Sequence, residues 1–291
     1  MTILRDGVVF FLVTCSREKS RADALRKTIT SLLAEHEKTG ICKHLVVFDN
    51  ASTFKEPLMD LPESVPIALC SGNIGYWGAL SWLAEHIGSI HPHEYQFVHP
   101  LESDLILYET QRLNNAIAFL ERCPEFSSVR TQEFNARFPW RYFKDYLPSF
   151  LINHRSSVSR FHTITGEKTT FSRYDGIQGM YTANWHIKVP ALHRLPVLRT
   201  ALAHLASQPH FTEKDFMAFM HEASPCGIGV LDKGIYYAQE EHNTVKGSAV
   251  SGSYTSPEEL AAQGYLATRT ASIPERLPEV SVVTPSEIGK N

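Results

Sequence analysis

The segment Leu45-Val46-Val47-Phe48-Asp49-Asn50-Ala51-Ser52-Thr53 passes from an apolar strand pattern directly into polar turn residues. The preceding chain contains a matching strand and a helix. Residues 8–13 form a continuous apolar run, which is typical of a strand buried on both faces, and residues 22–36 place apolar side chains at helical spacing. These patterns predict a strand, a helix and a second strand that gives way to a turn at Asp49.

The same alternation continues after this segment. A predicted strand over residues 65–69 ends at Cys70-Ser71-Gly72-Asn73, a predicted helix covers about residues 75–86, and a predicted strand over residues 95–98 leads into Glu102-Ser103-Asp104. Alternating strands and helices predict an α/β protein whose mostly parallel central sheet is flanked by helices. Ligands of such sheets bind beyond the carboxyl ends of the strands, so we expect a functional site at these polar strand ends.

Composition and charge exclude several classes of protein. The 291 residues carry 28 Lys and Arg against 31 Asp and Glu, a net charge of −3, and 43% of them are hydrophobic. This balance excludes a disordered chain, and no apolar run approaches the roughly 18 residues of a membrane span. Arg5 and Asp6 beside a short apolar run argue against a secretory signal, so we expect a cytoplasmic protein. The five cysteines are scattered and odd in number, which favours reduced core residues over disulfides or a CxxC metal site.

The pattern becomes looser in the second half of the chain. Helices are predicted near residues 110–122, over 192–205 and over 213–221, and a last strand over 229–237. From residue 243 onward Ser, Thr, Gly and Pro dominate, and only residues 257–263 form a convincing short helix. We therefore expect a single domain followed by an irregular C-terminal extension that wraps the surface or is partly mobile.

Two common phosphate-binding motifs do not fit this sequence. Residues 72–78 space their glycines as GxxGxxG and follow the third strand, whereas the dinucleotide-binding fingerprint needs GxGxxG after the first strand. Gly166-Glu167-Lys168-Thr169 lacks the glycine spacing of a P-loop. The sequence therefore argues against a Rossmann dehydrogenase and a P-loop NTPase.

Glu102-Ser103-Asp104 places two carboxylates at positions i and i+2. In an extended segment both point to the same side, where they suit a hard divalent cation that also binds two phosphate oxygens. Such triplets also occur as simple solvated turns. The polar strand ends at residues 49–53 and 71–75 favour the cation.

In order along the chain, residues 46–53, Asn73-Ile74-Gly75 and Glu102-Ser103-Asp104 resemble the nucleotide-sugar glycosyltransferases of the GT-A fold, especially the large inverting, family 2-like group. That group has a VVDNASTD segment, an NxG segment and a DXD triplet in this order. The resemblance covers residues 8–110 well and the second half loosely. It implies that Asp49 contacts the nucleobase and that Asp104 contacts the metal on the diphosphate.

The other candidates for the donor site are Thr14, Asn73, Gly75, Trp77, Glu102 and Ser103. The first position of the triplet is Glu102 where the family has Asp. Tyr76 and Trp77 are equally well explained as core residues of the helix over 75–86. The resemblance divides the domain into a donor-binding half at residues 1–110 and an acceptor-binding and catalytic half at residues 111–242, followed by the tail at residues 243–291.

The resemblance also implies an acceptor loop and a general base. Residues 175–180, with Gln178 and Gly179, stand in the place of the acceptor loop, and Glu213 and Asp215 stand in the place of an acidic pair at a helix start. Inverting transfer needs a carboxylate that takes the proton from the attacking hydroxyl, and Asp215 is the candidate base with Glu213 second. Both acids are also typical of the first turn of a helix. His242 stands where relatives have a histidine that contacts the metal or the diphosphate, although a lone histidine is more often structural.

Residues 137–173 hold seven Lys and Arg and two Asp and Glu among many aromatic residues, a local charge of +5 against −8 elsewhere. Three interpretations stay open. The aromatic residues pack while the cations stay solvated, or Arg137 and Arg141 bind the donor diphosphate or an anionic acceptor, or the segment binds nucleic acid. Some phage glycosyltransferases modify hydroxymethylated bases, which makes DNA one candidate acceptor.

Together these features predict a glycosyltransferase that depends on Mn²⁺ or Mg²⁺ and takes its sugar from a UDP-sugar. The expected acceptor is a hydroxyl of a saccharide or of a hydroxymethylated base in phage-type DNA. We expect transfer with inversion. Two other functions stay open. One is a nucleotidyltransferase, although the basic loop at residues 14–19 lacks the glycine expected there, and the other is a non-catalytic nucleic-acid-binding protein built around residues 137–173.

Overall fold

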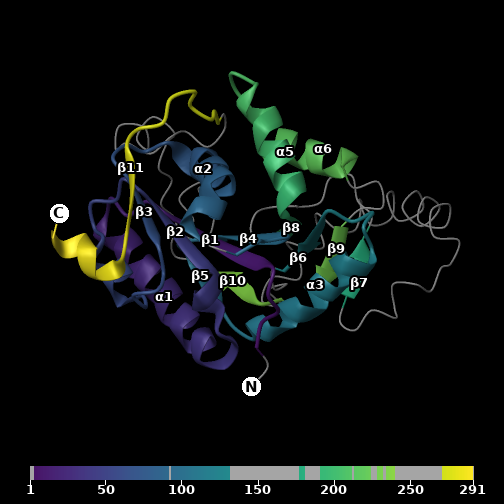
Figure 1. The fold of residues 1–291 in the computed structure, drawn as a ribbon, viewed down its shortest axis with the longest axis horizontal. Helices are drawn as coiled ribbons and strands as arrows, with labels where there is room; N and C mark the ends of the chain where they lie inside the picture. Colours follow the sequence, from purple (N-terminus) through teal and green to yellow (C-terminus); the bar gives the residue numbers. More distant parts are fainter. Residues whose placement is uncertain are drawn as a thin grey trace, which may run out of the picture.

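The computed structural model describes residues 3–91, 93–131, 177–180, 191–211, 213–223, 228–231, 234–239 and 271–290. These residues contain a sheet of nine strands in the order β11-β3-β2-β1-β4-β8-β6-β9-β7, with helices on both faces (Figure 1). The strands are β1 (Val8–Thr14), β2 (Leu45–Asn50), β3 (Ile67–Cys70), β4 (Phe97–Glu102), β6 (Ser128–Arg130), β7 (Ile177–Met180), β8 (Ala191–Arg194), β9 (Ile228–Leu231) and β11 (Val280–Val283). The predicted α/β class with a central sheet flanked by helices is confirmed.

Strand direction divides the sheet into two parts. Strands β3, β2, β1 and β4 are parallel neighbours, as the sequence predicts. Beyond β4 the sheet is mixed, because β8 is antiparallel to both β4 and β6, β9 is parallel to β6, and β7 is antiparallel to β9. The parallel part therefore comes from the first half of the chain.

Strand β1 is buried along its whole length because helices cover both of its faces. Val8, Phe10 and Leu12 pack in the core on the side of α1 (Lys19–Thr39) and α3 (Leu113–Arg122). The alternate side chains pack on the side of α2 (Gly75–Ile90), α5 (Leu195–Ala206) and α6 (Glu213–Glu222). Burial of each large apolar side chain contributes roughly 1.5–3 kcal/mol, so the run that begins at Val8 anchors both cores.

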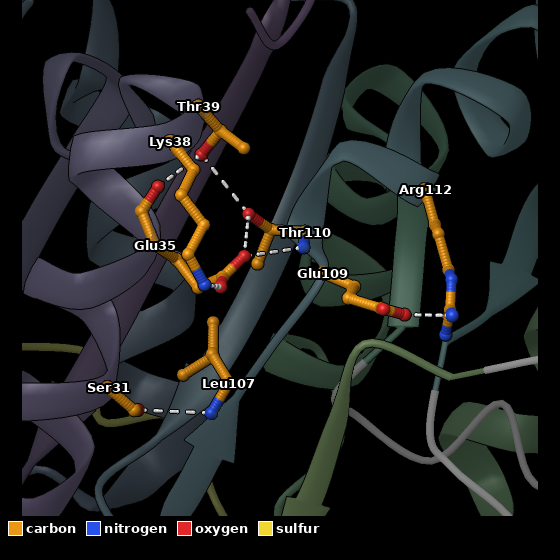
Figure 2. A network of polar contacts seen from close by, with 8 residues as sticks. All are labelled: Ser31, Glu35, Lys38, Thr39, Leu107, Glu109, Thr110 and Arg112. Carbon is orange, nitrogen blue, oxygen red and sulfur yellow. Dashed lines mark hydrogen bonds and ion pairs between the residues drawn. The ribbon is translucent and has the colours of Figure 1, made fainter. Parts of the chain in front are cut away.

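Polar side chains of α1 hold the segment that follows β4 (Figure 2). The buried carboxylate of Glu35 accepts hydrogen bonds from Lys38 Nζ at 2.8 Å and from the backbone N–H and hydroxyl of Thr110 at 2.8 and 3.0 Å. Ser31 Oγ accepts the N–H of Leu107 at 3.0 Å. Burial raises the pKa of Glu35, but the hydrogen bonds from Lys38 and Thr110 outweigh it, so the pKa lies below its usual value. Helix α1 therefore fixes the chain just beyond the carboxyl end of β4.

The helix predicted over residues 192–205 begins too early. Residues 191–194 form β8 instead, and α5 starts at Leu195 with Pro196 in its first turn. Pairing with β4 on one side and β6 on the other outweighs the local helical pattern.

The single strand predicted over residues 229–237 is also wrong, because the structure divides it. Residues 228–231 form β9, and β10 (Tyr236–Ala238) pairs with β5 (Leu105–Leu107) in a separate two-stranded sheet. The strand predicted over residues 95–98 lies at residues 97–102. Pro100 is tolerated there because β4 pairs with β8 only at Phe97 and Val98.

The C-terminal region adds an edge strand that the sequence analysis did not predict. Strand β11 pairs antiparallel with β3, the N–H of Ser71 donates to the carbonyl of Glu279 at 3.0 Å, and η6 (Pro285–Lys290) follows. Ala271 forms an antiparallel bridge with Phe211, next to the start of α6. The helix predicted over residues 257–263 lies outside the described residues.

The cysteines agree with the sequence analysis where the structure describes them. Cys42 and Cys70 are buried free thiols, Cys15 is a half-buried free thiol, and Cys226 lies outside the described residues. In the described part of the chain, no helix combines the length and the apolar character that crossing a membrane requires.

Candidate functional site

The carboxyl ends of four parallel strands meet at one edge of the sheet. Strand β1 lies between β2 and β4, so the strand order reverses at β1, and such reversal points are where α/β sheets bind ligands. The strand register pairs Thr14 with Asp49 and Val13 with Glu102. The structure therefore brings the predicted residues Thr14, Asp49 and Glu102 to the ends of adjacent strands.

Asp49 is a fully buried carboxylate at the end of β2. Its Oδ2 accepts the N–H of Ser52 at 3.4 Å and lies 3.8 Å from Nζ of Lys55. Its Oδ1 is buried and has no hydrogen-bond partner among the described residues. Burial raises the pKa of Asp49, against the lowering effects of Ser52 and Lys55. A buried acceptor without a donor is costly, and a ligand N–H would remove that cost.

The loop after β2 is locked onto the loop after β1. The N–H of Ser16 donates to Ser52 Oγ at 2.7 Å, and the carbonyl of Ser16 accepts the N–H groups of Thr53 and Phe54 at 3.1 and 2.9 Å. Ala51 adopts a left-handed conformation with φ of 58°, which turns the chain back toward β1. The Ala-Ser-Thr sequence thus holds the ends of β1 and β2 in a fixed relation around Asp49.

Asn73 and Gly75 form the start of α2. Asn73 Oδ1 accepts the N–H of Gly75 at 2.9 Å, and Asn50 Oδ1 accepts the N–H of Ile74 at 2.8 Å. Gly75 has φ of 74°, a conformation that glycine adopts without strain. These contacts give the NxG segment a role in joining β2 to α2, and its contact with a donor stays a prediction.

The predicted acidic triplet forms the turn between β4 and β5. Glu102 ends β4, and the side chains of Glu102, Ser103 and Asp104 are half-buried. The carbonyl of Ser103 accepts the hydroxyl of Thr28 at 2.9 Å, and the carbonyl of Asp104 accepts the N–H of Gln239 at 2.8 Å. The backbone of the turn is therefore fixed through its carbonyl groups from two other elements.

The donor set of this turn fits a hard divalent cation. Glu102 and Asp104 supply carboxylate oxygens, which Mn²⁺ and Mg²⁺ prefer, and a bound diphosphate would complete the coordination. Among the described residues, no group of three or more His, Cys, Asp or Glu side chains could hold a metal ion by itself.

Trp77 connects the start of α2 with the start of α6. Its ring lies 4.8 Å from the ring of Phe216 and 5.9 Å from that of Phe211, between centroids. The predicted base Asp215 precedes Phe216 in the first turn of α6 and is exposed. Trp77 is partly buried in this aromatic group, which supports its core interpretation, and the same group brings the acidic start of α6 next to α2.

The remaining predicted site residues lie on α6, on β7 or outside the described part of the chain. Glu213 is the first residue of α6, while Gln178 and Gly179 lie on β7, which pairs with β9 at the opposite end of the sheet from β3. Arg137, Arg141 and His242 lie outside the described residues, as does the rest of residues 137–173.

Sequence analysis missed Lys55, Thr28 and Gln239, which the structure places around the site. Thr28 carried a usable signal, because it is a polar residue among the apolar positions Leu25, Ile29 and Leu32 of α1. Gln239 carried none, because its contacts come from distant parts of the chain.

No protein-family model and no curated protein matches this chain. Among solved structures it is similar to S. aureus TarS 1–349, with 15% identity, a TM-score of 0.47, and coverage of 80% of this chain and 60% of that one. For the same protein in complex with UDP-GlcNAc the identity is 16%, the TM-score 0.47, and the coverage 88% of this chain and 64% of that one. The chain thus spans less than two thirds of the TarS chains it matches.

Proposed function

We propose that this chain is a glycosyltransferase that binds a nucleotide-sugar at the carboxyl ends of β1, β2 and β4. The observation that carries the proposal is Asp49, a fully buried carboxylate at the end of β2, beside the strand-reversal point at β1, whose Oδ1 has no partner among the described residues. The sequence resemblance of residues 46–53 to the nucleobase-binding segment of GT-A enzymes supports the same role.

Asp49 suits the imide N–H of uracil, which needs a single acceptor. Ser52 and Lys55 hold the other oxygen of the carboxylate, so buried Oδ1 is the oxygen that remains for a ligand N–H. Thr14 lies beside Asp49 in the strand register and would lie next to a base bound there. We therefore infer a UDP-sugar as the donor.

Glu102 and Asp104 would hold Mn²⁺ or Mg²⁺ together with the diphosphate of the donor. A cation there neutralises the charge that develops on the leaving diphosphate. The carbonyl contacts of Ser103 and Asp104 keep the turn in place while this charge develops.

Asp215 is the proposed general base, with Glu213 as the second candidate. Both belong to the first turn of α6, where the helix dipole favours the ionised carboxylate that a base needs. In the transfer, the acceptor oxygen forms a bond to the anomeric carbon, the bond from that carbon to the phosphate oxygen breaks, and the hydroxyl proton passes to Asp215. The nucleoside diphosphate leaves with the electron pair, and attack from the opposite face inverts the anomeric centre.

Calorimetry with UDP and UDP-sugars, with and without Mn²⁺ or Mg²⁺, tests the donor site. We expect Asp49→Asn to weaken UDP binding at least tenfold, because an amide presents N–H groups as well as an acceptor. Asp104→Asn should instead abolish the gain in affinity from the metal while metal-free UDP binding persists. Asp60→Asn, an exposed acid in η2 (Glu56–Asp60), is the matched control.

The donor and the acceptor are tested separately. Absence of UDP binding in the native protein, or equal binding by native protein and Asp49→Asn, would refute the proposed donor site. Turnover with saccharides compared with hydroxymethylated DNA then identifies the acceptor, for which Gln178, Gly179, Arg137 and Arg141 stay as predicted contacts. His242 stays a predicted contact of the metal or the diphosphate. Salt-dependent DNA binding without any response to UDP would instead favour a nucleic-acid-binding protein.

A further inference from the structure

The turn at Glu102-Ser103-Asp104 is held by two residues that are 211 positions apart in the sequence. Thr28 of α1 donates its hydroxyl to the carbonyl of Ser103 at 2.9 Å. Gln239, just after β10, donates its backbone N–H to the carbonyl of Asp104 at 2.8 Å and so extends the β5–β10 ladder by one bond. We call Thr28 and Gln239 the latch.

The two residues of the latch also bond to each other, which decides where the Thr28 hydroxyl points. Gln239 Nε2 donates to the carbonyl of Ala24 at 3.0 Å and to Thr28 Oγ1 at 3.3 Å. A threonine hydroxyl has one hydrogen and two acceptor sites. That hydrogen has two acceptors within reach, the carbonyl of Ser103 at 2.9 Å and the carbonyl of Ala24, 3.2 Å away in the preceding helical turn. By donating to both Ala24 and Thr28, Gln239 directs the hydroxyl hydrogen toward Ser103.

Burial makes these bonds hard to replace by water. Thr28 is fully buried and Gln239 is 8% exposed. Gln239 Oε1 is itself buried and has no partner among the described residues, which costs free energy that an apolar side chain would avoid. An amide at this position is therefore poorly explained by packing alone and well explained by its N–H contacts.

We propose that the latch sets the position of the acidic turn and thereby the strength with which Glu102 and Asp104 hold a divalent cation on a bound diphosphate. This inference rests on the proposed function. Thr28 and Gln239 are positioning residues, because they contact the turn through its backbone carbonyls. The latch should act on metal-dependent binding and leave the contact of Asp49 with the nucleobase unchanged.

The test compares the affinity for UDP in the absence and presence of saturating Mn²⁺, measured by calorimetry on the full chain. Thr28→Val removes the hydroxyl at constant shape, and we expect the gain in affinity from Mn²⁺ to fall about tenfold, which corresponds to one buried hydrogen bond. Metal-free UDP affinity should stay within twofold of the native value. Thr28→Ser keeps the hydroxyl and should retain the native gain.

Thr30→Val is the matched control on the same helix. Thr30 also donates to a carbonyl four residues earlier, Arg26 at 2.8 Å, but it is exposed. Gln239→Glu provides an independent change, because it removes the Nε2 donor at nearly constant volume and should reduce the gain as Thr28→Val does. Thermal unfolding of each variant identifies any general loss of stability, which would lower the UDP affinity in both conditions equally.

The outcomes separate the latch from the proposed function. If the native protein shows a Mn²⁺-dependent gain and Thr28→Val and Gln239→Glu both match Thr30→Val, the latch is refuted while the donor site stands. If the variants lose metal-free and metal-dependent affinity in the same proportion, the pair has only a structural role and the inference is wrong. If the native protein does not bind UDP, the proposed function and the latch both fail.

Discussion

Acidification should destabilise this protein through two histidines buried in the sheet. His99 of β4 and His193 of β8 are both fully buried. His99 Nδ1 lies 2.9 Å from the carbonyl of Pro100, which can only accept, so Nδ1 carries the proton, and Nε2 accepts the hydroxyl of Thr131 at 2.7 Å. His193 Nδ1 lies 2.7 Å from Ser128 Oγ. Both imidazoles are held in their neutral forms.

The size of this acid destabilisation follows from the lowered pKa values of the two histidines. Burial lowers the pKa of His99 from 6.5 to about 4, and burial together with His99 lowers that of His193 from 6.5 to about 3. Because the folded-state pKa values lie below the unfolded one, the stability that the neutral histidines contribute is fully present above pH 6.5. It is lost as the pH falls toward 4 for His99 and toward 3 for His193. At pH 5, each histidine lowers the free energy of unfolding by about 2 kcal/mol, at roughly 1.4 kcal/mol for each pH unit below 6.5. The pair therefore costs about 4 kcal/mol, a large fraction of the 5–15 kcal/mol typical of a native protein.

Urea denaturation at pH 7 and pH 5 measures this loss. His99→Gln cannot titrate and should reduce the fall in unfolding free energy by about 2 kcal/mol relative to the native protein. His44 and His91, whose pKa values burial also lowers, contribute equally to both proteins, so the difference isolates His99. His210→Gln, at an exposed position before α6, is the control and should behave as the native protein does. An equal fall in His99→Gln and native protein would refute the reasoning.

Other substitutions test contacts elsewhere in the fold by urea denaturation at pH 7. Glu35→Ala should lower the free energy of unfolding by about 1–3 kcal/mol, because it leaves the buried N–H of Thr110 without its acceptor. Glu35→Gln keeps an acceptor and should lower it by less. Equal losses in the two variants would contradict this account. Gly229→Ala should cost about 1–3 kcal/mol, because the added Cβ would lie 2.8 Å from Cε1 of Phe119. Gly88→Ala, in open space on α2, should stabilise the protein by up to about 1 kcal/mol, and a loss there similar to that of Gly229→Ala would count against steric crowding as the cause.

The first part of the fold was predictable because its signals are local. The apolar run at residues 8–13 gives a strand buried on both faces whatever its neighbours are, and β1 is buried throughout. Asp49 follows a second apolar run, so parallel pairing alone was enough to place it beside Thr14. The placement of Asp49 at the end of β2 was therefore predictable from local patterns, and its role in binding stays a prediction.

The second part depended on contacts that a local pattern does not contain. Residues 191–194 continue the apolar spacing of the helix that follows them, and only β4 and β6 on either side make them a strand. Gln239 has no neighbouring pattern that marks it, since its partner Thr28 lies 211 residues away. The division of this segment into β9 and β10 likewise reflects the pairing of β10 with β5.

The pairing of β3 with β11 has a consequence for biosynthesis. Residues 67–70 leave the ribosome long before residues 280–283, which supply their antiparallel neighbour. At 5–20 residues per second, translation of the intervening chain takes on the order of 10 s or more. During that interval β3 has no neighbour to cover its outer edge, and exposed apolar edges recruit other strands. The outer edge of β3 is therefore the last edge of the parallel strands to gain its neighbour during synthesis.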